Sequence, residues 1–177
     1  MQEMVIYGVS FDLVGKQPIV LLKTAEGNRF LPIWIGHPEA AAILMKLQGA
    51  STPRPMTHDL VTDMLGQLDA QVTRITVTEL KENTFYASIT VQQNGSEIEI
   101  DSRPSDAIAL AVRAGAKIFV ADDVIDESGV EFEGDASDDE IAAAAGVPPL
   151  AELDPDEFRA FLDSVSPDEF AADPDDS

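Results

Sequence analysis

The sequence predicts an α+β domain made of a duplicated strand-strand-strand-helix unit, with an extra helix between the copies and a mixed or antiparallel sheet covered by helices. Two observations support this prediction. Strand-like runs rich in β-branched residues are followed by segments with apolar residues at helical spacing, and the whole pattern recurs at a shift of 66 residues. One copy alone would leave a face of its sheet bare, so the two copies are expected to pack together.

The repeat is defined by identical residues in this register: Pro38 and Pro104, Ala41 and Ala107, Leu44 and Leu110, Gly49 and Gly115. Strands are expected at 5–9, 18–22 and 30–35 in the first copy and at 72–80, 84–92 and 97–101 in the second. Each triplet leads into a helix that starts with proline, a residue that suits the first helical turn.

The remaining elements follow from turn residues and apolar spacing. Hairpin turns are expected at 27–28 and 94–95, because Gly and Asn accept positive φ. Helices over 38–48 and 57–68 carry apolar residues three and four positions apart and should lie on the sheet. Gly115 should end the helix that begins at Pro104, and a short buried strand at 118–120 should close the domain.

The 177-residue chain has a formal net charge of −22, which is unevenly distributed. Residues 1–125 contain 10 Lys and Arg against 15 Asp and Glu, whereas residues 126–177 contain 1 against 18. The first segment is long enough for one domain with its own core. The second is expected to be an acidic, largely flexible tail with short helices, for which 137–140 provides a capping box and 154–165 an apolar face.

Several classes of protein are excluded by what the sequence lacks. It contains no cysteine, so disulfides and thiolate metal sites are ruled out. It has no signal-peptide pattern and no apolar run long enough to cross a bilayer, which predicts a cytoplasmic protein with no membrane partner. A nucleotide-binding enzyme of the phosphate-loop type is disfavoured, because the sequence has no Gly-rich, lysine-bearing loop.

The most informative stretch is 101–111, where a strand runs into an apolar helix. It places Asp101, Arg103 and Asp106 around the start of that helix, with Pro104 in the first turn and Arg103 or Ser102 as the cap. Such a junction can bind an anion or organise a metal.

Four segments in series resemble the bifunctional nuclease family: 54–60 (RPMTHDL), 84–87 (TFYA), 101–110 (DSRPSDAIAL) and 118–120 (IFV). The resemblance covers about residues 4–125 and does not reach the tail. It implies a compact α+β domain, association as a homodimer, and an ability to cleave both DNA and RNA.

Nuclease chemistry assigns roles to these residues. Asp101 and Asp106 are hard oxygen ligands for a divalent metal, Mg²⁺ or Mn²⁺. Arg103 would bind a phosphate through its planar guanidinium, and His58 would act as general base with Asp59 beside it. His37 and Glu39 form a second set, which the repeat places opposite Arg103 and Ser105. Catalysis requires His58, Asp101, Arg103 and Asp106 to converge on one exposed cleft.

A structural interpretation of the same residues stays open. Asp59 and Asp106 each lie where a carboxylate stabilises the positive end of a helix, and Arg103 would form an ion-pair cluster with its acidic neighbours. Thr57 is a natural cap for the helix that carries His58. Trp34 is expected in the core or at a dimer interface rather than as a stacking platform for a base.

The net charge limits the affinity for nucleic acid, because phosphate backbones are bound chiefly through Lys and Arg. A weak, metal-bridged contact with nucleic acid is the most that the composition supports. The alternative function is a non-catalytic dimeric interaction or regulatory module, whose acidic tail binds a basic protein partner or mimics nucleic acid.

Overall fold

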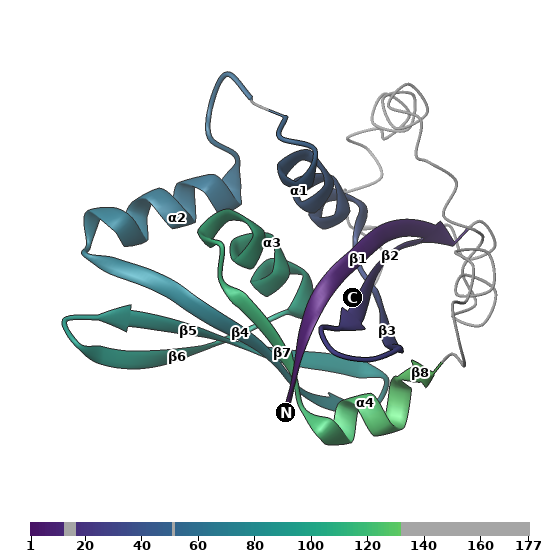
Figure 1. Cartoon of the computed structure of the whole chain (residues 1–177). Coiled ribbons are helices and arrows are strands. Elements are labelled where there is room, and N and C mark those ends of the chain that lie inside the picture. The colour runs from purple at the N-terminus through teal and green to yellow at the C-terminus, as the bar shows by residue number, and fades with distance from the viewer. Residues whose placement is uncertain (13–16, 51, 132–177) are drawn as a thin grey trace, which may run out of the picture.

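Two antiparallel three-stranded units lie on either side of one short central strand in the computed structural model, which describes residues 1–12, 17–50 and 52–131 (Figure 1). The first unit comprises β1 (Gln2–Asp12), β2 (Gln17–Thr24) and β3 (Arg29–Trp34), and the second β4 (Ala70–Lys81), β5 (Thr84–Gln93) and β6 (Ser96–Ser102). The central strand β7 (Lys117–Val120) pairs antiparallel with β1 and parallel with β4. The sheet order is β6-β5-β4-β7-β1-β2-β3-β8, with β8 at Val130–Glu131, and the one parallel pair makes the sheet mixed.

This arrangement confirms the predicted α+β class and its duplicated unit. Helix α1 (His37–Leu47) follows β3, and α3 (Pro104–Ala114) follows β6, each with proline in its first turn. Helix α2 (Thr57–Gln67) is the extra helix between the copies. Figure 1 shows α1, α2 and α3 on one side of the sheet.

The predicted turns are also confirmed. Asn94 and Gly95 have φ of 50° and 79° and connect β5 to β6, as a two-residue hairpin requires. Gly115 has φ of 67° and ends α3. A further tight turn, Glu82–Asn83, joins β4 to β5 with positive φ at both residues; it brings Asn83 to the site described below.

The core lies between the sheet and the three helices. Ile75 and Val77 of β4, Ile43 of α1 and Ile108 of α3 are fully buried there. Helix α2 contributes only partly buried side chains, Val61 and Leu65 among them, and packs against α3 and β4. All three helices thus pack on one common core.

The fold continues past the predicted domain boundary at residue 125, which falls within α4 (Asp122–Ser128). Strand β8 (Val130–Glu131) then pairs with β3. Arg29 fixes this end, because its Nη2 donates to the Ile125 carbonyl at 3.0 Å and pairs with Asp126 at 2.8 Å. The short helices predicted beyond residue 131 lie outside the described residues.

Within the described residues, no helix combines the length and apolar character that crossing a membrane requires.

Two glycines give a test of this packing. A Cβ at Gly129 would collide with the Ile125 carbonyl oxygen and lie 3.1 Å from its Cγ2, whereas a Cβ at Gly66, inside α2, meets nothing within 4 Å. Gly129→Ala should therefore destabilise the protein by about 1–3 kcal/mol, and Gly66→Ala should stabilise it by about 0.5–1 kcal/mol. Chemical denaturation measures both; a Gly129→Ala protein as stable as the parent would contradict the close approach of Gly129 to Ile125 of α4.

Candidate functional site

The starts of α1 and α3 meet through the side chain of Arg103. Strand β6 delivers Arg103 in an extended conformation to the cap of α3, where Pro104 begins the helix. The Nε and Nη2 atoms of Arg103 donate to the two oxygens of Asp106 at 2.7 and 3.1 Å, a bidentate arrangement. Nη2 also donates to Glu39 Oε1 at 2.8 Å. The guanidinium thus joins the two copies of the repeat.

His58 completes this cluster from the first turn of α2. Its Nε2 lies 3.2 Å from Asp106 Oδ1, and its side chain is only 14% exposed. The Arg103 side chain, by contrast, is 66% exposed. Helix α2 packs against α3, and this packing places the imidazole over the carboxylate. We call His58, Arg103, Asp106 and Glu39 the helix-start cluster.

The neighbours of Asp106 determine its charge, and its contact with His58 determines the tautomer of the imidazole. Burial raises the pKa of Asp106, but the hydrogen bonds from Arg103 and His58 outweigh this effect and leave the pKa below its ordinary value. Asp106 is therefore ionised at neutral pH and can only accept hydrogen bonds. The His58 Nε2 must then carry the proton, so Nδ1 is the basic atom of the neutral ring.

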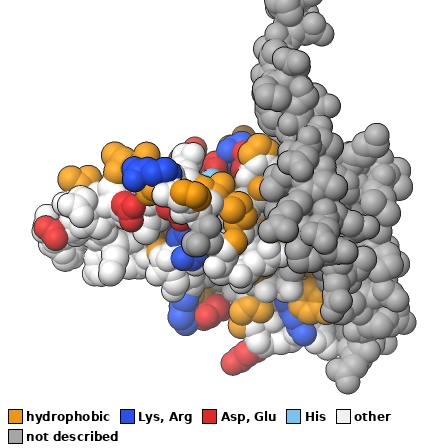
Figure 2. All heavy atoms as spheres, turned by 90° about the horizontal axis from the view of Figure 1, so that it is seen from above, with side chains coloured by type: hydrophobic (Ala, Val, Ile, Leu, Met, Phe, Trp, Pro, Cys, Tyr) orange, Lys and Arg blue, Asp and Glu red, His pale blue; other side chains and the backbone are white. Residues whose placement is uncertain are grey.

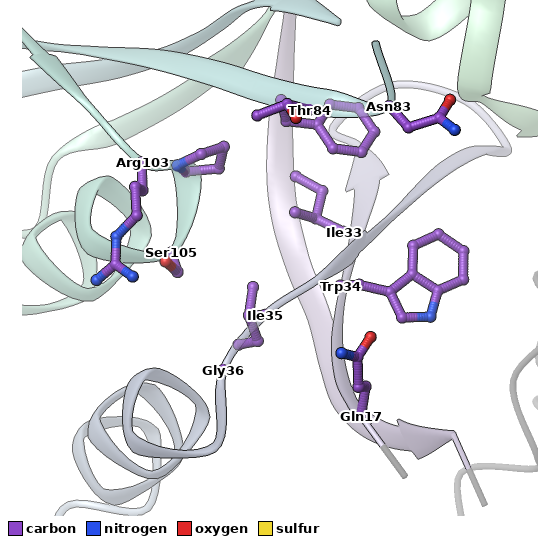
Figure 3. A pocket seen from close by; sticks show the side chains of 11 residues that line it. Gln17, Ile33, Trp34, Ile35, Gly36, Asn83, Thr84, Arg103 and Ser105 are labelled. Atoms are coloured by element: carbon purple, nitrogen blue, oxygen red, sulfur yellow. The ribbon is translucent and has the colours of Figure 1, made fainter. Parts of the chain in front are cut away.

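A pocket of about 350 Å³ lies directly beside Arg103. Its lining includes Arg103 and Ser105 from the start of α3, Ile35 and Gly36 from the segment before α1, and Thr84 from the start of β5, and Figure 3 shows Arg103 at one edge of it. Polar groups also come from Gln17 and Asn83. Sequence reasoning did not single out Ser105, Asn83 or Gln17; the repeat, which pairs Ser105 with Glu39, was the one signal that placed Ser105 at a helix start.

Trp34 lines the same pocket. Of the two positions expected for it, the core is wrong, and the dimer interface stays a prediction. Its side chain is 46% exposed, although Phe30, Leu31 and Ile33 before it in β3 are buried. The reason is its place at the end of the strand, where the sheet no longer covers it. Trp34 and Arg103 therefore line the same pocket.

Asp59 does not join the cluster, although it adjoins His58 in sequence. Its Oδ1 accepts from Arg113 Nε at 2.6 Å and its Oδ2 accepts from the Met56 N–H at 3.0 Å. Burial raises the pKa of Asp59, but these hydrogen bonds outweigh it and lower the pKa. Met56, rather than the predicted Thr57, occupies the cap of α2.

Arg113 makes this second ion pair a structural one. Its side chain is 4% exposed, and it donates to the carbonyls of Ala42 at 3.1 Å and Ala109 at 2.9 Å besides binding Asp59. One guanidinium thus connects α1, α2 and α3. This geometry agrees with the structural interpretation of Asp59.

Asp101 lies on the opposite face of the sheet. It pairs with Ser88 of β5, whose neighbours Ala87 and Ile89 are buried on the helix side. Side chains alternate along a strand, so Ser88 and Asp101 point away from the helices. The structure brings His58, Arg103 and Asp106 together but leaves Asp101 out.

The predicted metal pair, Asp101 and Asp106, does not fit a shared metal in this arrangement, because the two carboxylates occupy different faces. Asp106 already accepts hydrogen bonds from Arg103 and His58. Among the described residues, no group of three or more His, Asp or Glu side chains is placed to hold a metal ion.

Comparison with known proteins decides the family. A sequence model described as the bifunctional nuclease domain matches residues 20–133, which is more than half of the chain. The chain belongs to the bifunctional nuclease domain family. The family predicted from the four sequence segments is thereby confirmed, and the matched range contains every residue of the helix-start cluster.

Relatives of this bifunctional nuclease domain protein fall into two groups. Uncharacterized proteins of Mycobacterium tuberculosis are 40% identical over 172 residues, covering 97% of this chain and 99% of theirs. Plant proteins match only in part. Bifunctional nuclease 1 of Oryza sativa subsp. japonica is 29% identical over 57% of this chain and 32% of its own length, and Bifunctional nuclease 1 of Arabidopsis thaliana is 28% identical over 58% and 33%.

Arg113 provides a stability test that separates the two ion pairs. Arg113→Ala would leave the Asp59 carboxylate and two carbonyls without their donor, so we expect a loss of about 2–4 kcal/mol in the free energy of unfolding. Arg113→Lys keeps the charge but not the fork and should recover only part of this loss. Urea denaturation measures both variants; an unfolding free energy unchanged in Arg113→Ala would refute the structural role of the pair.

Proposed function

We propose that this bifunctional nuclease domain hydrolyses phosphodiester bonds of DNA and RNA in the pocket beside Arg103. The observation that carries the proposal is the combination of an exposed guanidinium at a pocket with a carboxylate-bound imidazole next to it. Family membership supports the same reaction class, because plant relatives carry the name bifunctional nuclease.

Arg103 is suited to bind the phosphate. Its Nε and Nη2 are engaged by Asp106 and Glu39, whereas Nη1 donates to no acceptor in the described part of the chain. These carboxylates hold the guanidinium plane in one orientation and leave the Nη1 edge available for a phosphate oxygen. A preorganised donor of this kind loses little freedom when the ligand binds.

His58 is the general base in this proposal, and Asp106 is its positioning residue. Nδ1 of His58 would take a proton from water, whose oxygen then forms a bond to phosphorus as the bond to the leaving oxygen breaks. Ionised Asp106 holds Nε2–H and stabilises the imidazolium that forms. The imidazolium, or solvent, returns a proton to the leaving oxygen.

The pocket favours features that DNA and RNA share. Arg103 would read the phosphate, and the exposed indole of Trp34 offers a flat surface on which a base can stack. Stacking tolerates any base, since every base has an aromatic face. Both interactions are independent of the sugar, which agrees with a substrate range that includes both polymers.

Dependence on Mg²⁺ or Mn²⁺ stays a proposal from the chemistry of phosphodiester hydrolysis, which divalent ions accelerate by neutralising charge. The described geometry assigns no residue set to such an ion. The experiment below therefore compares magnesium, manganese and chelator without a presumed ligand.

A second candidate function is a non-catalytic interaction module, and one observation favours it. Leu60, Met64 and Leu68 are exposed by 51–60% along one side of α2, four residues apart. An exposed apolar row of this kind is typical of a surface that another protein covers, a second copy of the chain included. In that case the helix-start cluster would be purely structural.

Cleavage of labelled single-stranded DNA and RNA by the purified protein, in magnesium, manganese or chelator, distinguishes the two functions. His58→Ala should lower kcat by about 10²–10⁴, because the proton acceptor is removed. Arg103→Ala should raise KM and lower kcat together, because the side chain that binds and positions the phosphate is removed. Asp101→Asn, altered on the opposite face, should cleave like the parent. Circular dichroism confirms folding of each protein.

Three outcomes of this assay would contradict the proposal. Cleavage that survives in His58→Ala would come from contamination or another site. Cleavage that is lost in Asp101→Asn would show that Asp101, on the opposite face, takes part in the reaction. A parent protein that cleaves neither DNA nor RNA under any of the three conditions would reject the nuclease function.

A further inference from the structure

Two basic side chains stand apart from the other cations of the fold. The described residues contain nine Lys and Arg, of which six form ion pairs with acids: Arg29, Arg74, Lys81, Arg103, Arg113 and Lys117. Lys23 lies over the rings of Tyr7 and Phe30. Lys46 and Arg54 remain, and within the described chain neither has a carboxylate within 4 Å.

Lys46 and Arg54 line the same pocket, a hollow of about 280 Å³ between the end of α1 and the start of α2. Arg113 and Asp59 also line it, but they neutralise each other at 2.6 Å. Asp63 is the one other charged residue in the lining. The pocket therefore carries a net positive charge, in a protein whose total is −22.

The loop that presents Arg54 is constrained before any ligand binds. Pro53 and Pro55 fix φ on both sides of Arg54, and the Thr52 hydroxyl donates to the Arg54 carbonyl at 2.6 Å. Fixing the backbone in advance reduces the entropy cost of binding. Arg54 on this constrained loop and Lys46 in the last turn of α1 are together suited to a polyanion.

This pocket adjoins the helix-start cluster. His58 contacts Asp106, and Asp59, the next residue, lines the Lys46–Arg54 pocket. Consecutive Cα atoms are about 3.8 Å apart, so the two features share the first turn of α2. Figure 2, which looks onto the helix side, shows basic, acidic and apolar side chains intermixed on the visible part of this face rather than a broad basic surface. Local unpaired cations, and not an extended field, must then provide the attraction.

We propose that the pocket of Lys46 and Arg54 binds a phosphate of the nucleic-acid strand, separate from the phosphate held at Arg103. The identity of the ligand rests on the proposed function, since the pocket and the helix-start cluster share the first turn of α2. The two cations fix the strand relative to His58 and contribute affinity that the rest of this acidic surface cannot supply.

Fluorescence anisotropy with a labelled single-stranded oligonucleotide tests the proposal on the full chain in chelator, with His58→Ala in every protein to prevent cleavage. The variant Lys46→Ala/Arg54→Ala should bind at least about tenfold more weakly at low salt. Its slope of log K against log salt concentration should be smaller by about 0.7 for each phosphate that the variant no longer neutralises. The matched control is Lys81→Ala/Lys117→Ala, which removes the same charge from exposed ion pairs elsewhere and should bind like the parent.

The exchange variant Lys46→Arg/Arg54→Lys keeps both charges and should retain binding. Equally weakened binding in the test and control variants, unchanged binding in the test variant, or no binding by the parent would each overturn the proposal. A competition experiment adds a further test, in which unlabelled competitors displace the labelled oligonucleotide. If a nucleoside monophosphate competes as well as the oligonucleotide at equal phosphate concentration, the pocket is a mononucleotide site and the proposal is overturned. Binding that depends on Lys46 and Arg54 without any cleavage by the original protein would reject the proposed function and keep this inference.

Discussion

The site depends on one guanidinium that joins the two copies of the repeat. Arg103 holds Asp106 through two parallel hydrogen bonds and Glu39 through a third, so the starts of α3 and α1 are fixed relative to each other. A single exposed ion pair contributes little to stability. The contribution of Arg103 is to orient its neighbours. Arg103 holds the Asp106 carboxylate from one side, and the carboxylate then positions His58 on its other side. Without Arg103, the imidazole would lose its oriented partner.

Two adjacent residues in the first turn of α2, His58 and Asp59, have different roles. Asp59 belongs to a closed ion pair with Arg113, whose side chain is 4% exposed and also donates to one carbonyl of α1 and one of its own helix, α3. His58 belongs to the open cluster, whose Arg103 is 66% exposed at a pocket. The buried pair anchors the helix, and this anchoring holds the neighbouring imidazole, whose side chain is 14% exposed, against Asp106.

Much of this arrangement could be predicted from the sequence, because the repeat and the turn residues act locally. The register of 66 residues predicted both proline-started helices, and Asn94–Gly95 predicted the hairpin that sets the pairing of β5 with β6. The face of the sheet on which Asp101 lies could also be predicted. Ile98 and Ile100 alternate with acids in the same strand, so Asp101 lies on the face opposite its apolar neighbours. Arg113 and Trp34 were not predictable, because their surroundings come from helix packing and from where the sheet ends.

We predict that His58 and Asp106 act as one unit, which a double-mutant cycle on phosphodiester cleavage tests. The cycle compares kcat/KM for four proteins: the parent, His58→Ala, Asp106→Asn and the double variant. If Asp106 acts only by positioning the imidazole, its substitution should cost nothing further once His58 is absent, and the double variant should match His58→Ala. Two losses that simply add in free energy would show independent roles and contradict the account.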